Sequence, residues 1–310
     1  MTTVSDGLYQ YGGVPVGGGP VFATNHVYFV KPASGNDLLP GTSPAQAWKT
    51  LAHAISRMVF GDVVYMIAES NTASGTTDYQ SATLNINVDG IKIIGVNSYC
   101  AIGQRSRIAQ LSTATGLAPL VNITANGVML ANIEIFQGVA DATSTCALKV
   151  SGQHCNFINC QISGIGDATM DVAGARSMIL DGCAESVFNN CYIGLDTVPR
   201  ATAAAEIELK GTANAVTRVI FNNCMINSDA GAATFLQVYA ANANCVDRFV
   251  MFNNCMFANA THSGASTMTN TMSLNTSLGG TIILKDTHRT GTNWATTGSG
   301  VLEKVGSTES

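Results

Sequence analysis

The sequence predicts an all-β repeat protein, a single coil of about seven stacked rungs. The first observation behind this prediction is a Phe-x-Asn-Cys pattern whose cysteines are 31, 33 and 31 residues apart: Cys160, Cys191, Cys224 and Cys255. The second is a period of two within each copy, in which Val219 and Phe221 alternate with Ile220, as in short half-buried strands. One unit of this size cannot bury its apolar side alone, so successive units are expected to stack.

Stacking would place like residues of successive rungs above one another, about 4.8 Å apart as in any β ladder. The aligned copies predict an inward aromatic column: Phe157, Phe188, Phe221 and Phe252. They also predict a column that turns the chain, because asparagine tolerates the left-handed backbone of a tight bend: Asn132, Asn159, Asn190, Asn223 and Asn254. The four cysteines form a third column, and they are expected to be reduced, buried and unreactive.

These ladders resemble those of the right-handed parallel β-helix in the pectin-lyase-like superfamily, and the resemblance extends from Tyr28 to Thr287. It implies a single right-handed parallel β-helix with an N-terminal capping helix and an extended N-terminal arm. Members of this superfamily include lyases, hydrolases, adhesins and virion proteins, so the fold does not specify the function.

The chain divides into four segments along this plan. Residues 1–25 are the arm, 26–80 the cap of the coil, 81–287 the β-helix and 288–310 a C-terminal tail. The arm is rich in glycine but carries apolar side chains that disordered tails usually lack: Leu8, Tyr9, Tyr11, Val14, Val16, Val21 and Phe22. We therefore expect it to become ordered against a partner; the alternative is a frayed terminus.

The cap is expected to contain a helix that begins after Ser43. Ser43 would cap it, Pro44 suits its first position and Gln46 completes a capping box. An apolar stripe follows at helical spacing: Trp48, Leu51, Ile55 and Met58. This order of strand, turn, helix and strand is similar to the opening of many coils in the same superfamily, where the helix covers the first rung. The turn at 35–37 is interpreted as part of the cap, because its single aspartate offers too few oxygen ligands for calcium.

The composition of the chain limits the classes of partner that it is expected to bind. Only 11% of the residues are charged, the net charge is −5 and no basic block occurs, which argues against nucleic acid and against a groove for polyanionic sugars. No stretch is long and apolar enough to predict a membrane helix, and the N-terminus lacks the features of a secretory signal. The nine cysteines lack the paired spacing of a metal site, so no metal and no cofactor are expected.

A search for catalytic residues finds carboxylate pairs but no complete catalytic set. Glycoside hydrolysis requires two carboxylates, and the candidate pairs are Asp167 with Asp171, Asp181 with Glu185, and Glu206 with Glu208. We expect these to be solvated polar positions. Arg200 is not accompanied by the aspartate cluster that pectate lyases of this fold carry, and the polygalacturonase motifs do not occur. The chain is therefore expected not to be an enzyme; the alternative is a polysaccharide hydrolase or lyase.

The sequence thus favours a non-enzymatic structural virion protein, a capsid cement or decoration protein of a tailed phage, as its resemblance to tailed-phage β-helix proteins implies. It would be assembled in the host cytoplasm and bind the major capsid protein or other virion subunits. A homotrimer is expected through outward apolar residues: Ile220, Met225, Met251 and Met256. The alternatives are a tailspike-type protein that binds or cleaves a surface glycan, and a bacterial carbohydrate-active enzyme or adhesin.

Overall fold

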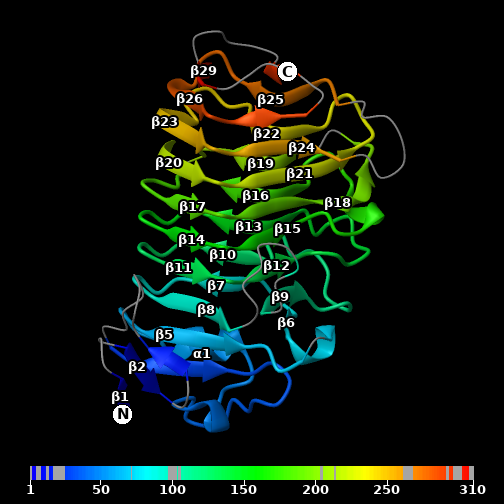
Figure 1. The fold of residues 1–310 in the computed structure, drawn as a ribbon. Helices are drawn as coiled ribbons and strands as arrows, with labels where there is room; N and C mark the ends of the chain where they lie inside the picture. The colour runs from blue at the N-terminus through cyan, green and yellow to red at the C-terminus, as the bar shows by residue number, and fades with distance from the viewer. Residues whose placement is uncertain are drawn as a thin grey trace.

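The chain folds into the right-handed parallel β-helix that the sequence predicts, with about seven turns and three parallel sheets (Figure 1). This computed structural model describes residues 2–4, 8–11, 14–16, 25–70, 72–96, 103, 106–202, 205–212, 214–260, 268–290, 293–295 and 302–306. Each turn contributes one strand to each sheet, so strands that are one repeat apart in the sequence are neighbours in space. This topology is what brings like residues of successive repeats into columns.

The three sheets are named here sheets 1, 2 and 3. Sheet 1 contains β7 (Leu84–Ile86), β10 (Val121–Ile123), β13 (Cys146–Val150), β16 (Arg176–Leu180), β19 (Ala205–Leu209), β22 (Leu236–Ala240), β25 (Asn270–Leu274) and β28 (Asn293–Ala295). Sheet 2 contains β4 (Val27–Val30), β5 (Val63–Ile67), β8 (Lys92–Val96), β11 (Met129–Ala131), β14 (Asn156–Ile158), β17 (Val187–Asn189), β20 (Val216–Asn222), β23 (Val246–Asn253), β26 (Gly279–Lys285) and β29 (Leu302–Val305). Sheet 3 contains β6 (Thr77–Gln80), β9 (Arg107–Gln110), β12 (Glu134–Phe136), β15 (Gln161–Ser163), β18 (Tyr192–Arg200), β21 (Met225–Ala230), β24 (Met256–Asn259) and β27 (His288–Arg289).

The aromatic column is confirmed. Phe157, Phe188, Phe221 and Phe252 pair in register across sheet 2 and are fully buried. Successive ring centroids are 4.3, 4.6 and 4.7 Å apart, and the ring planes differ by at most 11°. The spacing follows the distance between strands, so the rings stack because the backbone ladder holds them in line.

The asparagine column also has its predicted role. All five residues, Asn132, Asn159, Asn190, Asn223 and Asn254, have φ between 52° and 55°, the left-handed region that asparagine tolerates. Side-chain amides bridge the rungs at two steps. Asn159 Nδ2 donates to Asn132 Oδ1 at 2.7 Å, and Asn254 Nδ2 donates to Asn223 Oδ1 at 2.8 Å. These turns lead the chain from sheet 2 into sheet 3.

The cysteine column carries hydrogen bonds as well as packing. Each thiol donates to the carbonyl oxygen of the residue that occupies the aromatic column one rung earlier, as Cys224 does to Phe188 at 3.3 Å and Cys255 to Phe221 at 3.4 Å. Thr287 continues the series with its hydroxyl, which donates to the Phe252 carbonyl at 2.9 Å. Eight cysteines lie among the described residues, and all are buried and free. The thiols of this column therefore add hydrogen bonds between rungs to their packing in the core.

The cap differs from the predicted single helix. The segment forms a short 3-10 helix η1 (Pro44–Gln46), in which Ser43 makes no side-chain capping bond, and then the helix α1 (Leu51–Arg57), which begins after Thr50. Asp37 explains the break, since its carboxylate accepts from the backbone N–H groups of Lys49 and Thr50 and from the Thr50 hydroxyl. These bonds fix Thr50 in an extended conformation, where its own side chain caps α1 through His53 N.

The four predicted apolar positions are nevertheless buried in the main core: Trp48, Leu51, Ile55 and Met58. The turn at 35–37 is also part of the cap, because a side chain at Gly35 would place its Cβ 2.1 Å from the Trp48 carbonyl oxygen. Two further 3-10 helices lie at η2 (Ala73–Gly75) and η3 (Ala168–Met170). No helix in the described part of the chain is long and apolar enough to cross a bilayer; α1 has 7 residues.

The N-terminal arm forms a sheet of its own. Three short strands, β1 (Thr2–Val4), β2 (Leu8–Tyr11) and β3 (Val14–Val16), pair antiparallel in the order of the chain. This sheet is separate from the three parallel sheets of the coil. At the other end of the chain, β27, β28 and β29 add one strand to each of those three sheets.

Candidate functional site

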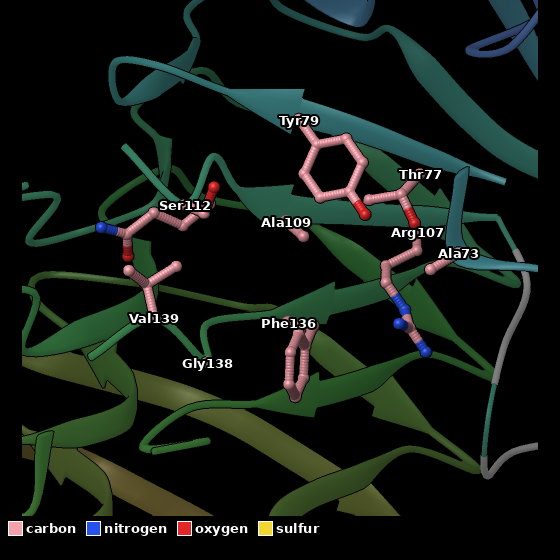
Figure 2. Close-up of a pocket in the computed structure, with 10 residues that line it drawn as sticks. Ala73, Thr77, Tyr79, Arg107, Ala109, Ser112, Phe136, Gly138 and Val139 are labelled. Atoms are coloured by element: carbon pink, nitrogen blue, oxygen red, sulfur yellow. The ribbon is translucent and has the colours of Figure 1, made fainter. Parts of the chain in front are cut away.

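A surface cleft lies on the outer face of sheet 3, near the N-terminal end of the coil (Figure 2). Its volume is about 270 Å³, and its lining comes from η2, from β6, β9 and β12, and from the loops that follow β9 and β12: Ala73, Thr77, Tyr79, Arg107, Ala109, Gln110, Ser112, Phe136, Gly138 and Val139. Side chains alternate between the two faces of a strand. Thr77 and Tyr79 therefore point outward from β6, as Arg107 and Ala109 do from β9.

Figure 2 shows the rings of Tyr79 and Phe136 on opposite sides of Ala109, with Thr77 and Arg107 at one end. The side chain of Tyr79 is 46% exposed, although it is a large aromatic residue. An exposed ring beside polar groups is common in sites for small molecules. The cleft thus offers an open aromatic wall.

The opposite wall of the cleft is the Phe136 ring, and its neighbours fix its position. A Cβ at Gly138 would lie 2.3 Å from the Phe136 ring, so only glycine at this position lets the ring rest against the loop. The guanidinium of Arg107 lies over the other side, with Cζ 5.2 Å from the ring centroid. Its Nε donates to Glu134 Oε2 at 2.6 Å, so the Nη atoms are not needed for this ion pair.

Two polar atoms that are buried in the rungs around the cleft lack hydrogen-bond partners among the described residues: Thr77 Oγ1 and Gln110 Oε1. Gln110 follows the outward residue Ala109, so its side chain lies on the inner face of sheet 3 and not in the cleft. Both side chains are almost fully buried, with 4% exposure for Thr77 and 3% for Gln110. The amide nitrogen of Gln110 is satisfied, because it donates to the Ala114 carbonyl and to Ser144 Oγ, each at 2.8 Å.

A second polar cluster lies beneath the loops between sheets 3 and 1. Arg200, at the end of β18, and Glu206, in β19, are both 0% exposed, and Asp229 of β21 is 1% exposed. Ser177 Oγ donates to Glu206 Oε2. Gly194 leaves room for this carboxylate, since a Cβ there would lie 2.9 Å from Glu206 Oε2. Burial raises the pKa of Glu206 to about 7, and the positive charge of Arg200 opposes this shift.

This cluster is sealed from solvent. A small core, separate from the main one, packs in the same loops and consists of Ile165, Met170, Ala175, Ala230, Phe235 and Met268. None of the three guanidinium nitrogens of Arg200 has a hydrogen-bond partner among the residues that the structure describes. The expectation that Glu206 is solvated is therefore wrong. It points away from the main core, as its alternation with Ile207 requires, but the loops cover it.

The remaining candidate carboxylates hold the fold together. Asp167 caps η3 through Thr169 N, and the Asp171 carboxylate accepts from Ala201 N at 2.6 Å. The other three form ion pairs: Asp181 with Lys149, Glu185 with Arg218, and Glu208 with Arg176. Across the described ranges, no group of three or more His, Cys, Asp or Glu side chains is placed to hold a metal ion.

The structure distributes the predicted subunit-contact residues over two surfaces. Ile220 and Met251 are neighbours on the outer face of sheet 2, and Met225 and Met256 are neighbours on the outer face of sheet 3. All four are half-buried. They flank the edge formed by the asparagine turns, two on each side.

A second asparagine ladder, which was not predicted, crosses sheet 2 beside Ile220 and Met251. Asn222 Nδ2 donates to Asn189 Oδ1, and Asn253 Nδ2 donates to Asn222 Oδ1, each at 3.0 Å. These amides bind one another along the outer face of the sheet, so this ladder adds bonds between rungs outside the core.

The predicted arm residues are described only in part. Leu8, Tyr9 and Tyr11 belong to β2, and Val14 and Val16 belong to β3. Val21 and Phe22 lie outside the described residues.

The sequence did not predict the cleft residues, because the repeats were aligned at inward and turn positions only. The signal was present at outward positions. Tyr79, Ala109 and Phe136 occupy equivalent places on successive rungs. An alignment of outward positions would have shown an alanine with one aromatic residue on the rung before it and one on the rung after it.

Comparisons with known proteins bear on the fold. No protein-family model and no curated protein matches the sequence. Among solved structures, pectate lyase Pel9A is similar at 13% identity with a TM-score of 0.59, over 86% of this chain and 63% of that chain. A pectin methylesterase from Aspergillus niger is similar at 12% identity with a TM-score of 0.53, over 94% of this chain and 87% of that one.

A third similar structure is ORF18 of Geobacillus virus E2, at 12% identity with a TM-score of 0.47, over 84% of this chain and 56% of that chain. At these identities the likeness shows the fold alone. The chain spans 63% of the length of the pectate lyase that it matches. The parallel β-helix is therefore what this chain shares with the pectate lyase and the pectin methylesterase.

Proposed function

We propose that the chain is a structural protein of a tailed-phage virion, a capsid cement or decoration protein whose β-helix is the exposed body and whose N-terminal arm is the attachment. The observation that carries this proposal is the separate arm sheet. Within the described residues, β1 and β3 each pair with β2 alone. An edge strand with unpaired backbone groups can accept a strand from another chain.

The size of the arm sheet supports the same role. Its strands have only 3 or 4 residues, and so small a sheet gains stability mainly by packing against something else. The coil itself is already closed at this end by α1. The arm is thus available for a partner, which we propose to be the major capsid protein or another virion subunit.

The body is proposed to be a homotrimer. Ile220, Met225, Met251 and Met256 lie on the two surfaces beside the asparagine edge. Three coils packed around a threefold axis would cover such an edge from both sides. Sedimentation as a monomer at micromolar concentration would contradict this part of the proposal.

A tailspike-type protein that binds or cleaves a surface glycan is the second candidate, and the cleft on sheet 3 favours it. The solved structures with this fold include a pectate lyase and a pectin methylesterase, so activity on a polysaccharide is the enzymatic form of this alternative. Binding is favoured over cleavage, because Glu206 has a pKa suited to proton transfer but is sealed with Arg200 beneath the loops.

Deletion of residues 1–25 tests the proposal. The truncated protein should keep its melting temperature, because the arm shares no sheet with the coil, but it should no longer bind particles of the phage that encodes it. Cosedimentation with arm-free particles is the measurement. The matched control is Tyr79→Ala in the full chain, which changes the cleft and should bind particles normally.

Two results would replace the proposal with the second candidate. One is normal particle binding by the truncated protein. The other is release of oligosaccharides from a bacterial surface polysaccharide or from pectin by the intact chain.

A further inference from the structure

We propose that the N-terminal arm docks, within the same chain, on an apolar surface formed by the outer face of sheet 2 at its N-terminal end. This surface, called the dock below, belongs to β4, β5, β8, β11 and β14. Its buried members on these strands are Phe29, Val63, Tyr65, Ile94, Met129 and Ala131. The inference goes beyond the proposed function, because it concerns the position of the arm before any partner binds.

The dock faces away from the main core. On β5, Val64 and Met66 belong to the main core, so Val63 and Tyr65, which alternate with them, lie on the outer face of the sheet. The same alternation places Ile94 on the outer face of β8. The dock residues form a cluster of their own, separate from the main core. The integrity of the coil core therefore does not depend on what covers the dock.

One outward column of sheet 2 shows where the dock ends. From β4 to β14, the residues in register are apolar: Phe29, Tyr65, Ile94, Ala131 and Ile158. On the next four strands the column is polar: Asn189, Asn222, Asn253 and Lys285. Contiguous apolar surface on a soluble protein marks a site of contact. The apolar half of the column is thus suited to a cover, and the polar half to water.

The dock is covered within the single chain. Phe29 is 0% exposed and Tyr65 is 7% exposed, although the strands of a sheet do not cover their own outer face. Burial also raises the pKa of Tyr65. Farther along the same column, Asn189 and Asn222 are only half-buried. The cover of the dock therefore comes from a segment of this chain outside the three sheets of the coil.

The arm is the segment that ends at the dock. The chain enters the coil at His26, whose N–H donates to Asp62 Oδ1 at 2.9 Å and whose carbonyl oxygen accepts from Val63 N at 2.9 Å. Figure 1 shows β1 and β2 at this same end of the coil. Residues 17–24 join β3 to this point, and a stretch of that length reaches up to roughly 27 Å. Five neighbouring strands span roughly 19 Å, so the arm can reach the whole dock of its own chain.

The composition of the arm matches the dock. The arm is rich in apolar residues and carries a single charged side chain, Asp6. Lys92, of opposite charge, lies on the outer face in register with Val63 and Met129, and burial lowers its pKa. A tethered segment is present at a high effective concentration, which favours the arm of the same chain over that of a second copy. Attachment to a virion subunit would require the arm to leave the dock.

The first test is photo-crosslinking in the full-length chain, with Tyr9 replaced by the photoreactive residue benzoylphenylalanine. After irradiation, mass spectrometry of the peptides should find adducts on the dock, at Tyr65, Ile94 or Met129. A denaturing gel separates the two possible sources of the arm. The adducts should run at the mass of one chain, because a link to a second copy would double the mass.

The second test disturbs the dock and measures hydrogen exchange of the arm. Ile94→Asn introduces the residue that the coil itself carries in this column at Asn189 and Asn222, so the coil should tolerate it. Docking would bury the new amide, so amides of β1–β3 should exchange about tenfold faster than in the wild type. The matched control is Ile283→Asn, the same change at a half-buried outward position of sheet 2 beyond the dock. It should leave exchange of the arm unchanged.

Three results would overturn the inference. The first is the absence of adducts on the dock. The second is adducts that run only at the mass of two chains, which would assign the dock to the arm of a second copy. The third is unchanged exchange of the arm in Ile94→Asn. No particle takes part in these experiments, so the dock can fail while the proposed function stands, and the reverse.

Discussion

Two sets of aromatic residues in this molecule differ in how their neighbours repeat. In the core, Phe157, Phe188, Phe221 and Phe252 repeat on four successive rungs, and each interior ring is covered by its own kind above and below. On the outer face of sheet 3, Tyr79 and Phe136 are separated by Ala109 on the intervening rung. Repetition fills space completely, whereas one small residue in the series opens a cleft. In this coil, the repeat is kept where the core is closed, and it is broken where the surface has a cleft.

The largest expected effect is the loss of a ring from the core column. Phe221→Ala should lower the free energy of unfolding by about 3–5 kcal/mol, because the site is fully buried between two rings and cannot collapse easily. Phe136→Ala, at the half-exposed cleft wall, should cost much less. Denaturant unfolding of the two variants measures the difference, and equal losses would contradict the comparison.

The sealed cluster should make stability depend on pH. The folded protein keeps the Glu206 proton up to about pH 7, because burial raises the pKa of this carboxyl to about 7. The unfolded chain releases the proton near the usual glutamate pKa of about 4.3. The contribution of Glu206 to stability is therefore fully present below that value, and up to about 3 kcal/mol is lost as the pH rises through 7. Asp78, whose pKa burial raises to about 6, acts in the same direction.

Thermal unfolding between pH 4 and pH 8 (about the range in which these groups titrate) tests this dependence. Glu206→Gln should flatten the fall in stability. Its control is Glu208→Gln on the same strand, half-buried and paired with Arg176, which should keep the fall. An identical pH profile in Glu206→Gln and the wild type would show that the carboxyl is ionised throughout.

The cysteine column should be inert in the native protein. Burial raises the pKa of Cys160, Cys191 and Cys224, and no thiol of the column reaches solvent. Cys255 departs from the expectation of a raised pKa. The side-chain hydrogen bond with Cys224 lowers its pKa, and this outweighs burial. All four thiols should react only as the coil opens, which mass spectrometry after limited labelling follows; rapid labelling of all four in native buffer would contradict their burial.

The hydrogen bonds of this column predict the smallest effect. Cys224→Thr should be tolerated, because Thr287 already donates to a carbonyl at the equivalent place one rung beyond Cys255. Cys224→Val has a similar shape but no donor, so it should be less stable than the threonine variant by about 1 kcal/mol. If unfolding midpoints show valine to be the better substitute, the thiols serve only as apolar filling.

The sequence was sufficient for the columns because they repeat. A residue such as Phe221 is specified by its copies on neighbouring rungs as well as by its own surroundings. Features that occur once could not be read in this way. The helix α1 begins at Leu51 and not after Ser43, because Asp37 binds the backbone at Lys49 and Thr50, a contact that joins two separate segments.

The sites depend on non-repeated contacts even more strongly. Glu206 alternates with Ile207 as an outward residue should, yet loops from other rungs bury it. The cleft depends on Gly138, which allows the Phe136 ring to lie against the loop. Loop packing of this kind is set by the shape of the chain around one position, so periodicity carries no information about it.

The proposed function, which requires that a phage encodes this chain, is tested most directly by a reconstruction of intact particles of that phage. The account predicts β-helices that project from the capsid shell, with residues 1–25 bound to a neighbouring subunit and the coil outside the contact. Density for the coil at the tail tip, with the arm free of the shell, would contradict it.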